Sequence, residues 1–485
     1  MPHEGKPFRA GRVRGYLRGR VWYLCYWESG RRSRPRVGTD RAAAKLLAAE
    51  INSQLEAGTP SALSFEKVAV PELRRRWLAH HENVRRSSVH TVRRYRAATD
   101  HLLRFVDAVR PVRDASEFLA SHAEEFVAYL RRVRVSPNGH PNSAKRGLLD
   151  KGVAFIAGAC RAMFGFAAKQ RHLSPYAANP FAALEIDRMP VDDAKPVVLF
   201  TAEEEAAFVR ACDDWQFPVM LTLMLTGLRP GELAHLVLPD DVDLEAGALR
   251  VRNKPDLGWQ VKTRAERAVP VVPVLAEALR RSVGARTTGP VFLRREFSAG
   301  RSTPALGGRT QKELEKEVRE RASDGRDRLG RAPGRAGILS IARCVWRDAG
   351  AITPKHVRSE FIRVCRLAGM AGQTSPKMLR HLFATSLQEG NVDWMVRMEL
   401  MGHSQGRSGG PGPLGMTARY THTRDETRRG QLVAALEQRP AVAAARERLE
   451  AAHAEARSAR TMPSSCARRS ISATSPGHSR STAAS

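Results

Sequence analysis

The chain has 485 residues, which is enough for two or three domains with sizeable hydrophobic cores. Its formal net charge of +30 and its pI of about 10.9 favour a polyanionic partner, with nucleic acid ahead of an anionic membrane surface. No apolar run approaches the roughly 20 residues that span a bilayer, and the polar, basic N-terminus lacks the apolar segment of a signal peptide.

The six cysteines are scattered along the chain and form no CxxC pair. Zinc sites and disulfide frameworks need closely spaced or paired cysteines, so neither is expected. Each thiol is most simply a small apolar residue in a reducing compartment. With its large positive charge, the chain is therefore expected to be a cytoplasmic protein associated with the nucleoid. Abundant arginine and alanine with little lysine suggest a GC-rich bacterial genome.

The first predicted domain covers residues 12–57. It contains aromatic and β-branched segments separated by turn residues, a pattern typical of a small β-sheet. Three strands are expected, over residues 13–17, 21–27 and 35–38. A helix should follow over 41–55, with Thr39 or Asp40 as its N-terminal cap.

The exposed positions of this predicted sheet are mostly arginine, Arg14 and Arg18 among them. A sheet that enters a DNA groove needs such a surface, because arginine side chains meet phosphate oxygens and base edges. An ordinary solubilising face is the alternative explanation. We favour contact with double-stranded DNA over that alternative.

A linker over 58–64 leads into a second predicted domain, residues 64–188, which is helical throughout. Apolar residues recur there at spacings of three and four, as they do on one face of a helix. The segment 87–91 can cap a helix that carries a basic cluster. This cluster is predicted to face DNA and consists of Arg93, Arg94 and Arg96.

A mixed α/β region is expected over residues 196–435, after a second linker. Residues 299–335 are rich in Gly and Arg and are predicted to be a surface insertion, with one charged helix over 311–321. A C-terminal helix is expected over 436–460. The Ser-, Arg- and Ala-rich residues 461–485 should be disordered.

The segment LTGLRPGEL, residues 225–233, is the first motif with chemical potential. Its glycine permits a tight helix end, and its proline is tolerated in the first turn of the next helix. Arg229 then lies where that helix starts, with Glu232 one turn later to hold its guanidinium group. A fixed guanidinium matches the oxygens of a phosphate, although a structural ion pair would give the same pattern.

Lys262 belongs to a second motif, VKTRAERAVPV. Strands are expected over residues 249–252, 261–263 and 267–271, joined by a loop and then a turn. Lys262 lies near that turn, which places its ammonium group within reach of a ligand. Taken alone, a strand lysine is usually only solvated.

Three more motifs complete the set, SPKMLRHLFATSL, LMGHS and ARYTH. In the first of them Lys377 and Arg380 lie three residues apart, on one face of a predicted helix, and leucine and phenylalanine form its buried side. The second contains His403 and the third contains Tyr420. Any one of these motifs would be weak by itself.

The five motifs occur in the order and rough spacing of tyrosine recombinases, so the chain resembles the tyrosine recombinase (phage integrase) family. The resemblance covers about 196–435 and extends less tightly to the regions before it. It implies a mainly α-helical fold with small β-sheets. Its parts would be an arm-type DNA-binding module (three-stranded sheet plus helix), a helical, SAM-like core-binding domain and a mixed α/β catalytic domain.

The resemblance also implies a role for each motif. Tyr420 would attack a scissile phosphodiester, forming a 3′-phosphotyrosyl bond and freeing a 5′-hydroxyl. Arg229 and Arg380 would stabilise charge on the non-bridging oxygens, while His403 would donate a hydrogen bond to the phosphate. Lys262 would protonate the departing oxygen. Because the bond energy stays in the covalent link, neither ATP, nor metal, nor any other cofactor is required.

Tyr420 is also supported by its surroundings in the sequence. It is the only tyrosine after Tyr176, and basic residues such as Arg419, His422 and Arg424 make its neighbourhood electropositive. Positive charge favours a phenolate. For an isolated tyrosine, a half-buried position on an amphipathic helix would be the default explanation.

Two features depart from the family pattern. The family usually has histidine where this chain has Lys377, and a lysine accepts the tyrosine proton only in its neutral form, although it can still bind phosphate. The Gly- and Pro-rich residues 405–415 lengthen the interval between His403 and Tyr420. A flexible loop there would either help to deliver Tyr420 to a partner's site or impair its positioning.

These departures leave two alternatives to an active site-specific recombinase. One is a catalytically defective DNA-binding relic of the same family. The other is a type IB topoisomerase-like enzyme, which shares the chemistry but relaxes supercoils without site preference. A two-metal nuclease is disfavoured, because its candidate ligands Asp240, Asp241 and Asp243 match an ordinary segment of the recombinase pattern.

Finally, the resemblance implies DNA recombination and integration for a mobile element such as a phage, island or transposon. The active species would be a homotetramer on two DNA duplexes, with accessory DNA-bending or directionality factors as further partners. The alanine-rich helical segment 426–456 is expected to dock onto a neighbouring protomer.

Overall fold

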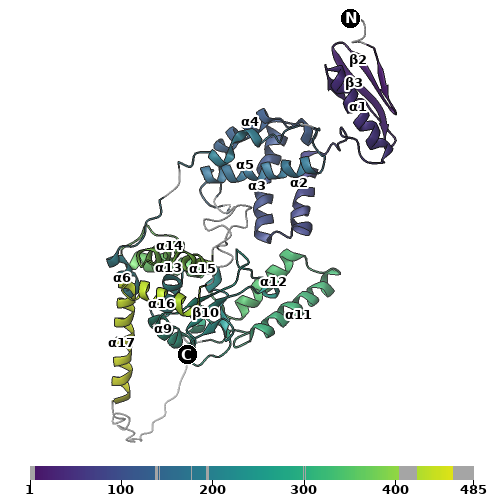
Figure 1. The fold of residues 1–485 in the computed structure, drawn as a ribbon. Coiled ribbons are helices and arrows are strands. Elements are labelled where there is room, and N and C mark those ends of the chain that lie inside the picture. Colours follow the sequence, from purple (N-terminus) through teal and green to yellow (C-terminus); the bar gives the residue numbers. More distant parts are fainter. Residues whose placement is uncertain are drawn as a thin grey trace, which may run out of the picture. The chain divides into compact units, whose positions relative to one another are not determined.

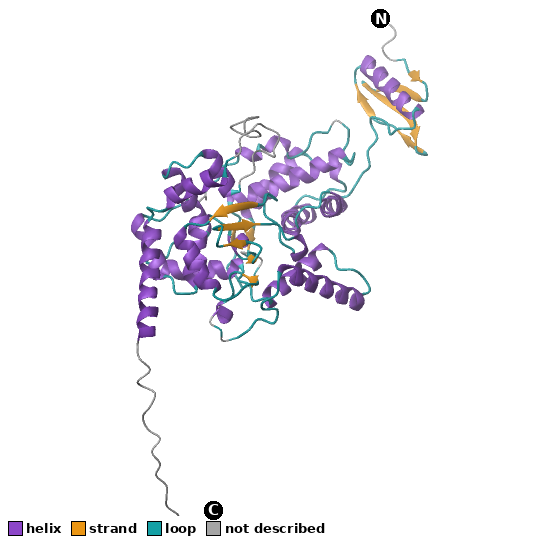
Figure 2. Cartoon of the chain, turned by 60° about the horizontal axis from the view of Figure 1, so that its bottom comes forward, coloured by secondary structure: helices purple, strands orange, loops and turns teal. Residues whose placement is uncertain are grey.

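The computed structural model describes residues 6–136, 140, 142–175, 177–192, 196–298, 300, 302–402 and 423–461. The chain divides into two compact units, Met1–Pro196 and Val197–Ser485, and each unit is described by itself. Figure 1 traces the elements along the chain, and Figure 2 shows that helices predominate over small separate sheets. The expected fold class, mainly α-helical with small β-sheets, is confirmed.

The N-terminal module is an antiparallel sheet with a helix packed on one face. Its strands are β1 (Phe8–Ala10), β2 (Val13–Arg18), β3 (Val21–Glu28), β4 (Arg31–Ser33) and β5 (Arg36–Gly38). Helix α1 (Arg41–Glu56) is capped by Asp40, whose carboxylate accepts a hydrogen bond from the Ala42 amide at 2.7 Å. Leu24 of the sheet and Ile51 of the helix belong to their shared core.

The prediction of three strands was incomplete, because β1 and β4 were missed. Each has only three residues: β4 reads Arg-Arg-Ser and has no apolar residue, and β1 reads Phe-Arg-Ala, which is too short for its alternation to predict a strand. They are strands because β1 pairs with β2 and β4 pairs with β3. Pairing with a longer neighbour therefore decides their conformation, rather than local sequence.

The rest of the first unit is mainly helical, whereas residues 64–188 were expected to be helical throughout. Its helices are α2 (Val70–Ala79), a π-helical turn (His80–Val84), α3 (Val89–Ala108), α4 (Ala120–Arg132) and α5 (Asp150–Lys169). Ser88 caps α3 by accepting a hydrogen bond from the Thr91 amide at 3.1 Å. A short hairpin, β6 (Arg134–Val135) with β7 (Arg146–Gly147), was not predicted.

Helix α5 is the most apolar helix of this unit. Over its 20 residues it is long and apolar enough to cross a membrane, contrary to the expectation that no run approaches this length. Eight of its residues are buried, Cys160 and Phe164 among them. The Phe164 ring lies 5.2 Å from that of Phe118, inside the core of the bundle. The apolar character of α5 is thus accounted for by burial within the protein.

The second unit surrounds one large core. Its helices are α6 (Ala202–Ala211), α7 (Gln216–Thr226), α8 (Pro230–Leu233), α9 (Pro273–Val283), α10 (Arg295–Ser298), α11 (Gln311–Leu329), α12 (Arg335–Asp348), α13 (Pro354–Leu367), α14 (Lys377–Glu389), α15 (Trp394–Met401), α16 (Asp425–Leu436) and α17 (Pro440–Thr461). All eleven residues of α7 are buried, so it is the central helix of this core. A helix that is apolar on all sides requires such a position.

The described residues of this unit form two small sheets. Strands β9 (Val242–Asp243), β10 (Ala248–Val251) and β11 (Arg267–Pro270) form one, and β8 (Val237–Leu238) pairs with β12 (Gly289–Pro290) in the other. The strands expected near 249–252 and 267–271 are confirmed as β10 and β11. The strand expected over 261–263 is wrong: the Val261 amide donates to the Asn253 side chain instead of a strand, and a turn follows.

Helices α11 and α12 form a hairpin with a small core of its own. The charged helix expected over 311–321 continues to Leu329. Val318 of α11 and Trp346 of α12 belong to this core, together with Leu257 from the loop before β11. The Trp346 indole also donates a hydrogen bond to the Leu257 carbonyl at 3.1 Å. The predicted insertion is therefore packed against the loop that leads to β11.

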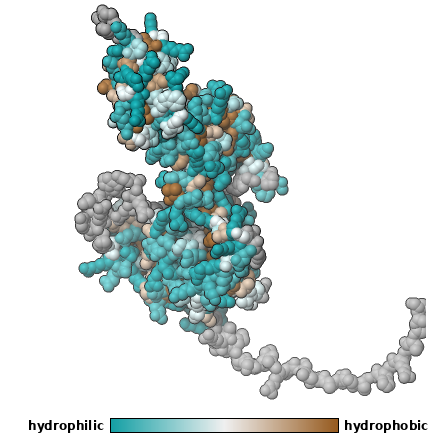
Figure 3. All heavy atoms as spheres, turned by 90° about the vertical axis from the view of Figure 1, so that its right-hand side faces the viewer, coloured by the Kyte–Doolittle hydropathy of each residue, from teal (hydrophilic) through white to brown (hydrophobic). Residues whose placement is uncertain are grey.

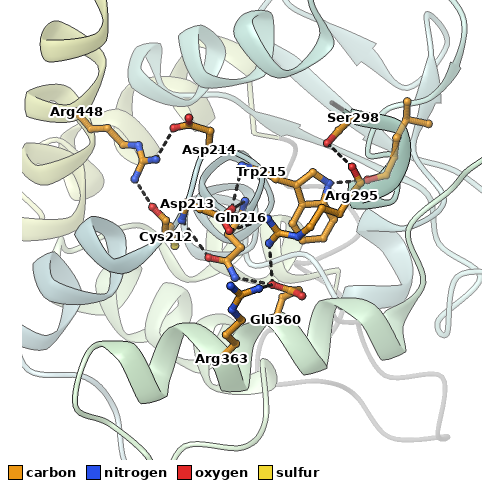
Figure 4. Close-up of polar contacts among 11 residues, drawn as sticks. Cys212, Asp213, Asp214, Trp215, Gln216, Arg295, Ser298, Glu360, Arg363 and Arg448 are labelled. Carbon is orange, nitrogen blue, oxygen red and sulfur yellow. Dashed lines mark hydrogen bonds and ion pairs between the residues drawn. The ribbon is translucent and has the colours of Figure 1, made fainter. Parts of the chain in front are cut away.

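Helix α17 packs on α6 and α9 of its own unit. Ala441, Val442, Ala444 and Ala445 are buried there. Figure 4 shows Arg448 reaching from α17 to the Cys212 carbonyl and the Asp214 carboxylate, the latter at 2.7 Å. The expectation that 426–456 docks onto a neighbouring protomer is thus wrong for the first half of α17, whose apolar residues are already covered within the chain.

The surface in Figure 3 is mostly hydrophilic, with apolar residues scattered over it. Large apolar side chains with high exposure include Trp27 at 64% and Leu46 at 74% in the N-terminal module. Single exposed apolar residues are normal for a soluble fold and do not mark an interface by themselves.

Candidate active site

The junction between α7 and α8 fixes the first arginine of the site. Gly227 ends α7 with a left-handed φ of 60°, and a Cβ atom there would lie 2.3 Å from the Phe383 ring. Only glycine fits both restrictions. Pro230 then opens α8, so that Arg229 lies at the N-terminal cap of this helix, as predicted.

Glu232 holds the Arg229 guanidinium in place. Its Oε1 pairs with Arg229 Nη1 at 2.7 Å, and its Oε2 accepts a hydrogen bond from the Arg229 amide at 3.0 Å. The Glu232 side chain is 1% exposed and that of Arg229 is 26% exposed. The carboxylate is therefore buried beneath a guanidinium that still faces outward, which confirms the expected pairing.

Arg267 is a site residue that was not predicted. Its Nη2 pairs with Glu232 Oε2 at 2.7 Å, and its Nε donates to the Leu400 carbonyl at 3.0 Å. Burial alone would raise the pKa of Glu232. The hydrogen bond and the charge of Arg267, together with the charge of Arg229, outweigh burial and leave the pKa of Glu232 below its ordinary value. In the sequence, Arg267 is marked only by its place in the motif VKTRAERAVPV, where Arg264 and Arg267 follow Lys262.

Arg380 joins the same cluster from α14. Its Nη1 donates to the Gly227 carbonyl at 2.6 Å and its Nη2 donates to the Met401 carbonyl. These bonds use two of its five donors. Burial, followed by the positive charge of Arg229, lowers the pKa of Arg380 to about 10. Arg380 therefore lies close enough to Arg229 to feel its charge, as the resemblance to the family implies.

The charge of the cluster would suit an anion. Arg229, Arg267 and Arg380 surround one carboxylate, Glu232, so positive charge remains uncompensated among the described residues. Like charges are costly to gather unless an anion is present to balance them. Planar guanidinium groups suit the oxygens of a phosphate. The geometry therefore fits the binding of a phosphate group.

Lys262 and Lys377 are both exposed. Lys262 lies in the turn before β11, five residues ahead of Arg267. Lys377 is the first residue of α14, one turn before Arg380. Neither ammonium group makes a hydrogen bond or ion pair with the residues that the structure describes. His381, the neighbour of Arg380, is exposed as well.

His403 and Tyr420 lie outside the described residues. The chain that leads to His403 is nevertheless tied to the arginine cluster. Helix α15 ends in Leu400 and Met401, whose carbonyl groups accept hydrogen bonds from Arg267 and Arg380. The connection from the cluster to His403 is therefore a single residue, Gly402.

The arginines predicted to face DNA are exposed in both parts of the first unit. Arg14 and Arg18 lie on the sheet face opposite α1, beside the stacked rings of Tyr16 and Tyr23, whose centroids are 5.8 Å apart. On α3, Arg93, Arg94 and Arg96 are exposed. The Arg94 guanidinium lies 4.0 Å from the centre of the Phe155 ring.

The acidic cluster before β10 is paired with cations. Asp241 binds Lys254 at 2.7 Å and Arg252 at 2.6 Å, and Asp243 binds Arg250 at 3.0 Å. Within the described part of the chain, no group of three or more His, Cys, Asp or Glu side chains could hold a metal ion. The carboxylates of this cluster therefore have a structural explanation.

Comparison with known proteins identifies the second unit. Residues 199–427 match the phage integrase family. Tyrosine recombinase XerC of Xylella fastidiosa (strain M23) is 27% identical over 286 residues, which are 57% of this chain and 72% of that protein. XerC of Xanthomonas axonopodis pv. citri (strain 306) is 26% identical over 324 residues, which are 65% of this chain and 77% of that protein.

Solved structures with some similarity include the Tn1549 transposon integrase in complex with circular intermediate DNA. It has 17% sequence identity and a TM-score of 0.46, and the match covers 75% of this chain and 99% of that one. A lambda integrase tetramer bound to a Holliday junction has 16% sequence identity and a TM-score of 0.44, and the match covers 81% of this chain and 97% of that one. Residues 199–427, which lie in the second unit, thus match the phage integrase family, and the relatives that the chain resembles are tyrosine recombinases.

Proposed function

We propose that this protein is a site-specific DNA recombinase, an integrase, that cleaves and rejoins duplex DNA through a 3′-phosphotyrosyl intermediate at Tyr420. The observation that carries the proposal is the gathering of Arg229, Arg267 and Arg380 around the buried carboxylate of Glu232. A cluster of this charge suits a scissile phosphate. The reaction requires neither metal nor ATP.

Each described member of the cluster has a separate task. Arg229 and Arg380 bind the non-bridging oxygens of the scissile phosphate, where negative charge grows as the phosphorane forms. Glu232 orients Arg229. Arg267 fixes the other side of Glu232 and the end of α15, so that it acts on the site through its neighbours.

The bonds change at one phosphorus atom. The Tyr420 oxygen attacks as a phenolate, whose proton has passed to solvent, and forms the new P–O bond as the bond to the 5′-oxygen breaks. Lys262 donates a proton to that leaving oxygen, and His403 donates a hydrogen bond to the phosphate. Lys377 binds the phosphate in place of the family's histidine. Attack by a 5′-hydroxyl on the phosphotyrosine reverses the steps and rejoins the strand.

The proposed substrate is duplex DNA inside a bacterial cell, held by a homotetramer on two duplexes. Residues 12–57 and 64–188 would supply the arm-type and core-binding contacts, through exposed arginines of the sheet and of α3: Arg14, Arg18, Arg93, Arg94 and Arg96. Integration and excision for a mobile element, with accessory DNA-bending or directionality factors, follow from the same proposal.

A covalent-trapping experiment tests this function. Nicked suicide duplexes that tile the DNA flanking the gene are incubated with the full chain, and adducts are resolved on denaturing gels. We expect an adduct with one sequence for the wild type and none for Tyr420→Phe. Arg229→Ala and Arg380→Ala should lower adduct formation by on the order of 100-fold or more.

The same assay separates the two alternatives. A catalytically defective relic, which the exposed lysine at position 377 favours, would bind the duplexes but give no adduct with any of them. A type IB topoisomerase-like enzyme would give adducts on many sequences and would relax supercoiled plasmid without a specific site. Sequence-restricted adducts and strand exchange between two sites support the recombinase.

A further inference from the structure

Lys262 is carried by a tight turn, residues 261–264. The Arg264 amide donates a hydrogen bond to the Val261 carbonyl at 2.9 Å. Arg264 has a φ of 61°, in the left-handed region. That conformation costs a residue with a Cβ atom about 1 kcal/mol, so neighbouring contacts have to maintain it. The turn is therefore held in place from outside.

One side chain, that of Asn253, supplies these contacts. Its Oδ1 accepts a hydrogen bond from the Val261 amide at 2.9 Å, and its Nδ2 donates to the Arg264 carbonyl at 3.1 Å. The two bonded residues stand at the two ends of the turn that presents Lys262. The Asn253 amide also donates to Glu266 Oε1 at 2.8 Å, beyond the turn.

Asn253 is itself anchored to the core. The next residue, Lys254, has a side chain that is 1% exposed and pairs with the buried Asp241 at 2.7 Å. The backbone of Lys254 also exchanges two hydrogen bonds with Trp259, both of 3.0 Å. A buried ion pair and a closed backbone pair leave the main chain at Asn253 little freedom, so Asn253 can transmit a fixed position to the turn.

The chemistry of the side chain matters here. A carboxamide offers an acceptor and a donor on one short planar group, which the two ends of the turn require. Aspartate keeps the acceptor for the Val261 amide but faces the Arg264 carbonyl with a second acceptor. Alanine removes both bonds. Lys262 gains no hydrogen bond or ion pair of its own from the described residues, so the turn alone positions it.

We infer that Asn253 is a positioning residue, which holds the turn so that the Lys262 ammonium group meets the 5′-oxygen that leaves the scissile phosphate. This inference rests on the proposed function, in which Lys262 is the general acid. Asn253 touches no reacting atom. Its effect on cleavage passes through Lys262 and is confined to the step in which the leaving oxygen takes up a proton.

A change of leaving group tests this route. The suicide duplex is prepared with the ordinary 5′-oxygen at the scissile position and, separately, with sulfur in place of that oxygen. A thiolate leaves without a proton, so general-acid catalysis no longer contributes. We expect Asn253→Ala to form adduct about 10-fold more slowly on the oxygen substrate, a part of the roughly 100-fold or greater contribution of a general acid. On the sulfur substrate its rate should match the wild type.

A double variant adds an independent measurement. If Asn253 acts only through Lys262, Asn253→Ala in a Lys262→Ala background should slow the oxygen substrate no further. Asn253→Asp serves as a second variant of nearly unchanged size, and urea unfolding checks that each variant is folded. Gln373→Ala is the matched control, because it also removes an amide hydrogen bond to a carbonyl group, that of Val198, away from this turn.

The outcomes separate the inference from the proposed function. Equal slowing by Asn253→Ala on both substrates, additive losses in the double variant, or no slowing at all would each overturn the role of Asn253. If Lys262→Ala is equally impaired on oxygen and sulfur, the general-acid assignment fails and this inference falls with it. If the wild type gives no adduct with any duplex, the proposed function itself is overturned.

Discussion

Glu232 is the residue that allows the arginines to stay together. Its two oxygens pair with Arg229 and Arg267 at 2.7 Å, and its side chain is 1% exposed. A buried carboxylate between two guanidinium groups compensates charge that would otherwise be costly, and it also fixes their directions. The same contacts therefore serve stability and, in the proposed function, phosphate binding.

The variant Glu232→Gln should separate these two contributions. It keeps the shape of the side chain but leaves the nearly buried Arg267 without its counter-charge, so we expect the free energy of unfolding to fall by about 3 kcal/mol. The adduct-forming rate should fall by on the order of 10-fold or more, because Arg229 loses its fixed direction. Urea unfolding and the trapping assay measure the two effects. Glu245→Gln, an exposed change, should alter neither.

His235 gives the fold a pH dependence. It stacks on Trp259 with ring centroids 4.0 Å apart, lies at the edge of Trp346, and bonds the Gly231 carbonyl through Nδ1 at 2.6 Å. Burial, with a smaller effect of the Lys254 charge, lowers the pKa of His235 from 6.5 to about 4. The imidazole is therefore neutral in the folded protein at neutral pH.

The sign of the effect follows from this lowered pKa. Between pH 6.5 and about 4 the unfolded chain binds a proton at His235 and the folded chain does not. The neutral His235 therefore makes its full contribution to the free energy of unfolding above pH 6.5. That contribution falls by about 3 kcal/mol as the pH falls to about 4, because each unit of pKa difference corresponds to 1.36 kcal/mol. Urea unfolding across this range measures the slope. His235→Phe should remove that share of the slope, and an unchanged slope would contradict the assignment.

At the scale of elements, α17 shows how a helix can be predicted without its partner. Its alanine-rich sequence favours a helix, but an apolar helical face fits any apolar surface. The structure places the buried residues of α17 against α6 and α9. Arg439 adds ion pairs to Glu205 and Glu389 at the start of the helix. These contacts make the first half of α17 part of the second unit.

Two neighbouring alanines of α17 test this packing. Ala444 is 1% exposed and Ala443 is exposed. Ala444→Asp places an unpaired charge in the interface with α6 and should lower the free energy of unfolding by about 3 kcal/mol. Ala443→Asp should change it by no more than about 0.5 kcal/mol. The comparison is made by urea unfolding of the full chain at a concentration where it is monomeric. Equal effects would show that α17 is not held within its own chain.

The parts of the site that local spacing determines were predictable. Arg229 follows a helix-ending glycine, and Lys377 and Arg380 share one turn of α14, so three- and four-residue spacing was sufficient. Arg267 was not predictable in this way, because its partners are Glu232 and the Leu400 carbonyl, 35 and 133 residues away. The short strands β1 and β4 were missed for the same reason, since pairing across the sheet defines them.

The conformation around Lys262 was not predicted, for a different reason. Its turn was expected to be a strand, because Val261 and Thr263 alternate with it as strand residues do. The observed turn depends on two hydrogen bonds from Asn253 and on the left-handed backbone of Arg264, which no apolar pattern encodes. Sequence patterns thus identified the lysine but not the conformation that presents it.

At the scale of the whole molecule, the net charge of +30 is distributed over both units. The arginine cluster lies in the second unit, and the exposed arginines of the N-terminal sheet and α3 lie in the first. Each phosphate contact that displaces a condensed counterion adds to the salt dependence of DNA binding. If several such contacts are spread over the modules, the affinity for DNA should fall steeply as the salt concentration rises.

The contribution of the N-terminal module to that dependence can be measured by two matched substitutions. Arg14→Ala removes an exposed charge from the sheet face opposite α1, whereas Lys45→Ala removes one from the outer side of α1 in the same module. If the sheet face contacts phosphates, Arg14→Ala, and likewise Arg18→Ala, should lower the slope of log K against log salt concentration by about one unit. Lys45→Ala should leave the slope unchanged, because α1 packs on the other face.

Fluorescence anisotropy with the full chain and a labelled duplex gives these slopes. Equal slopes for the arginine and lysine variants would mean that the sheet face does not contact the DNA backbone, and the arm-type role of this module would then be wrong.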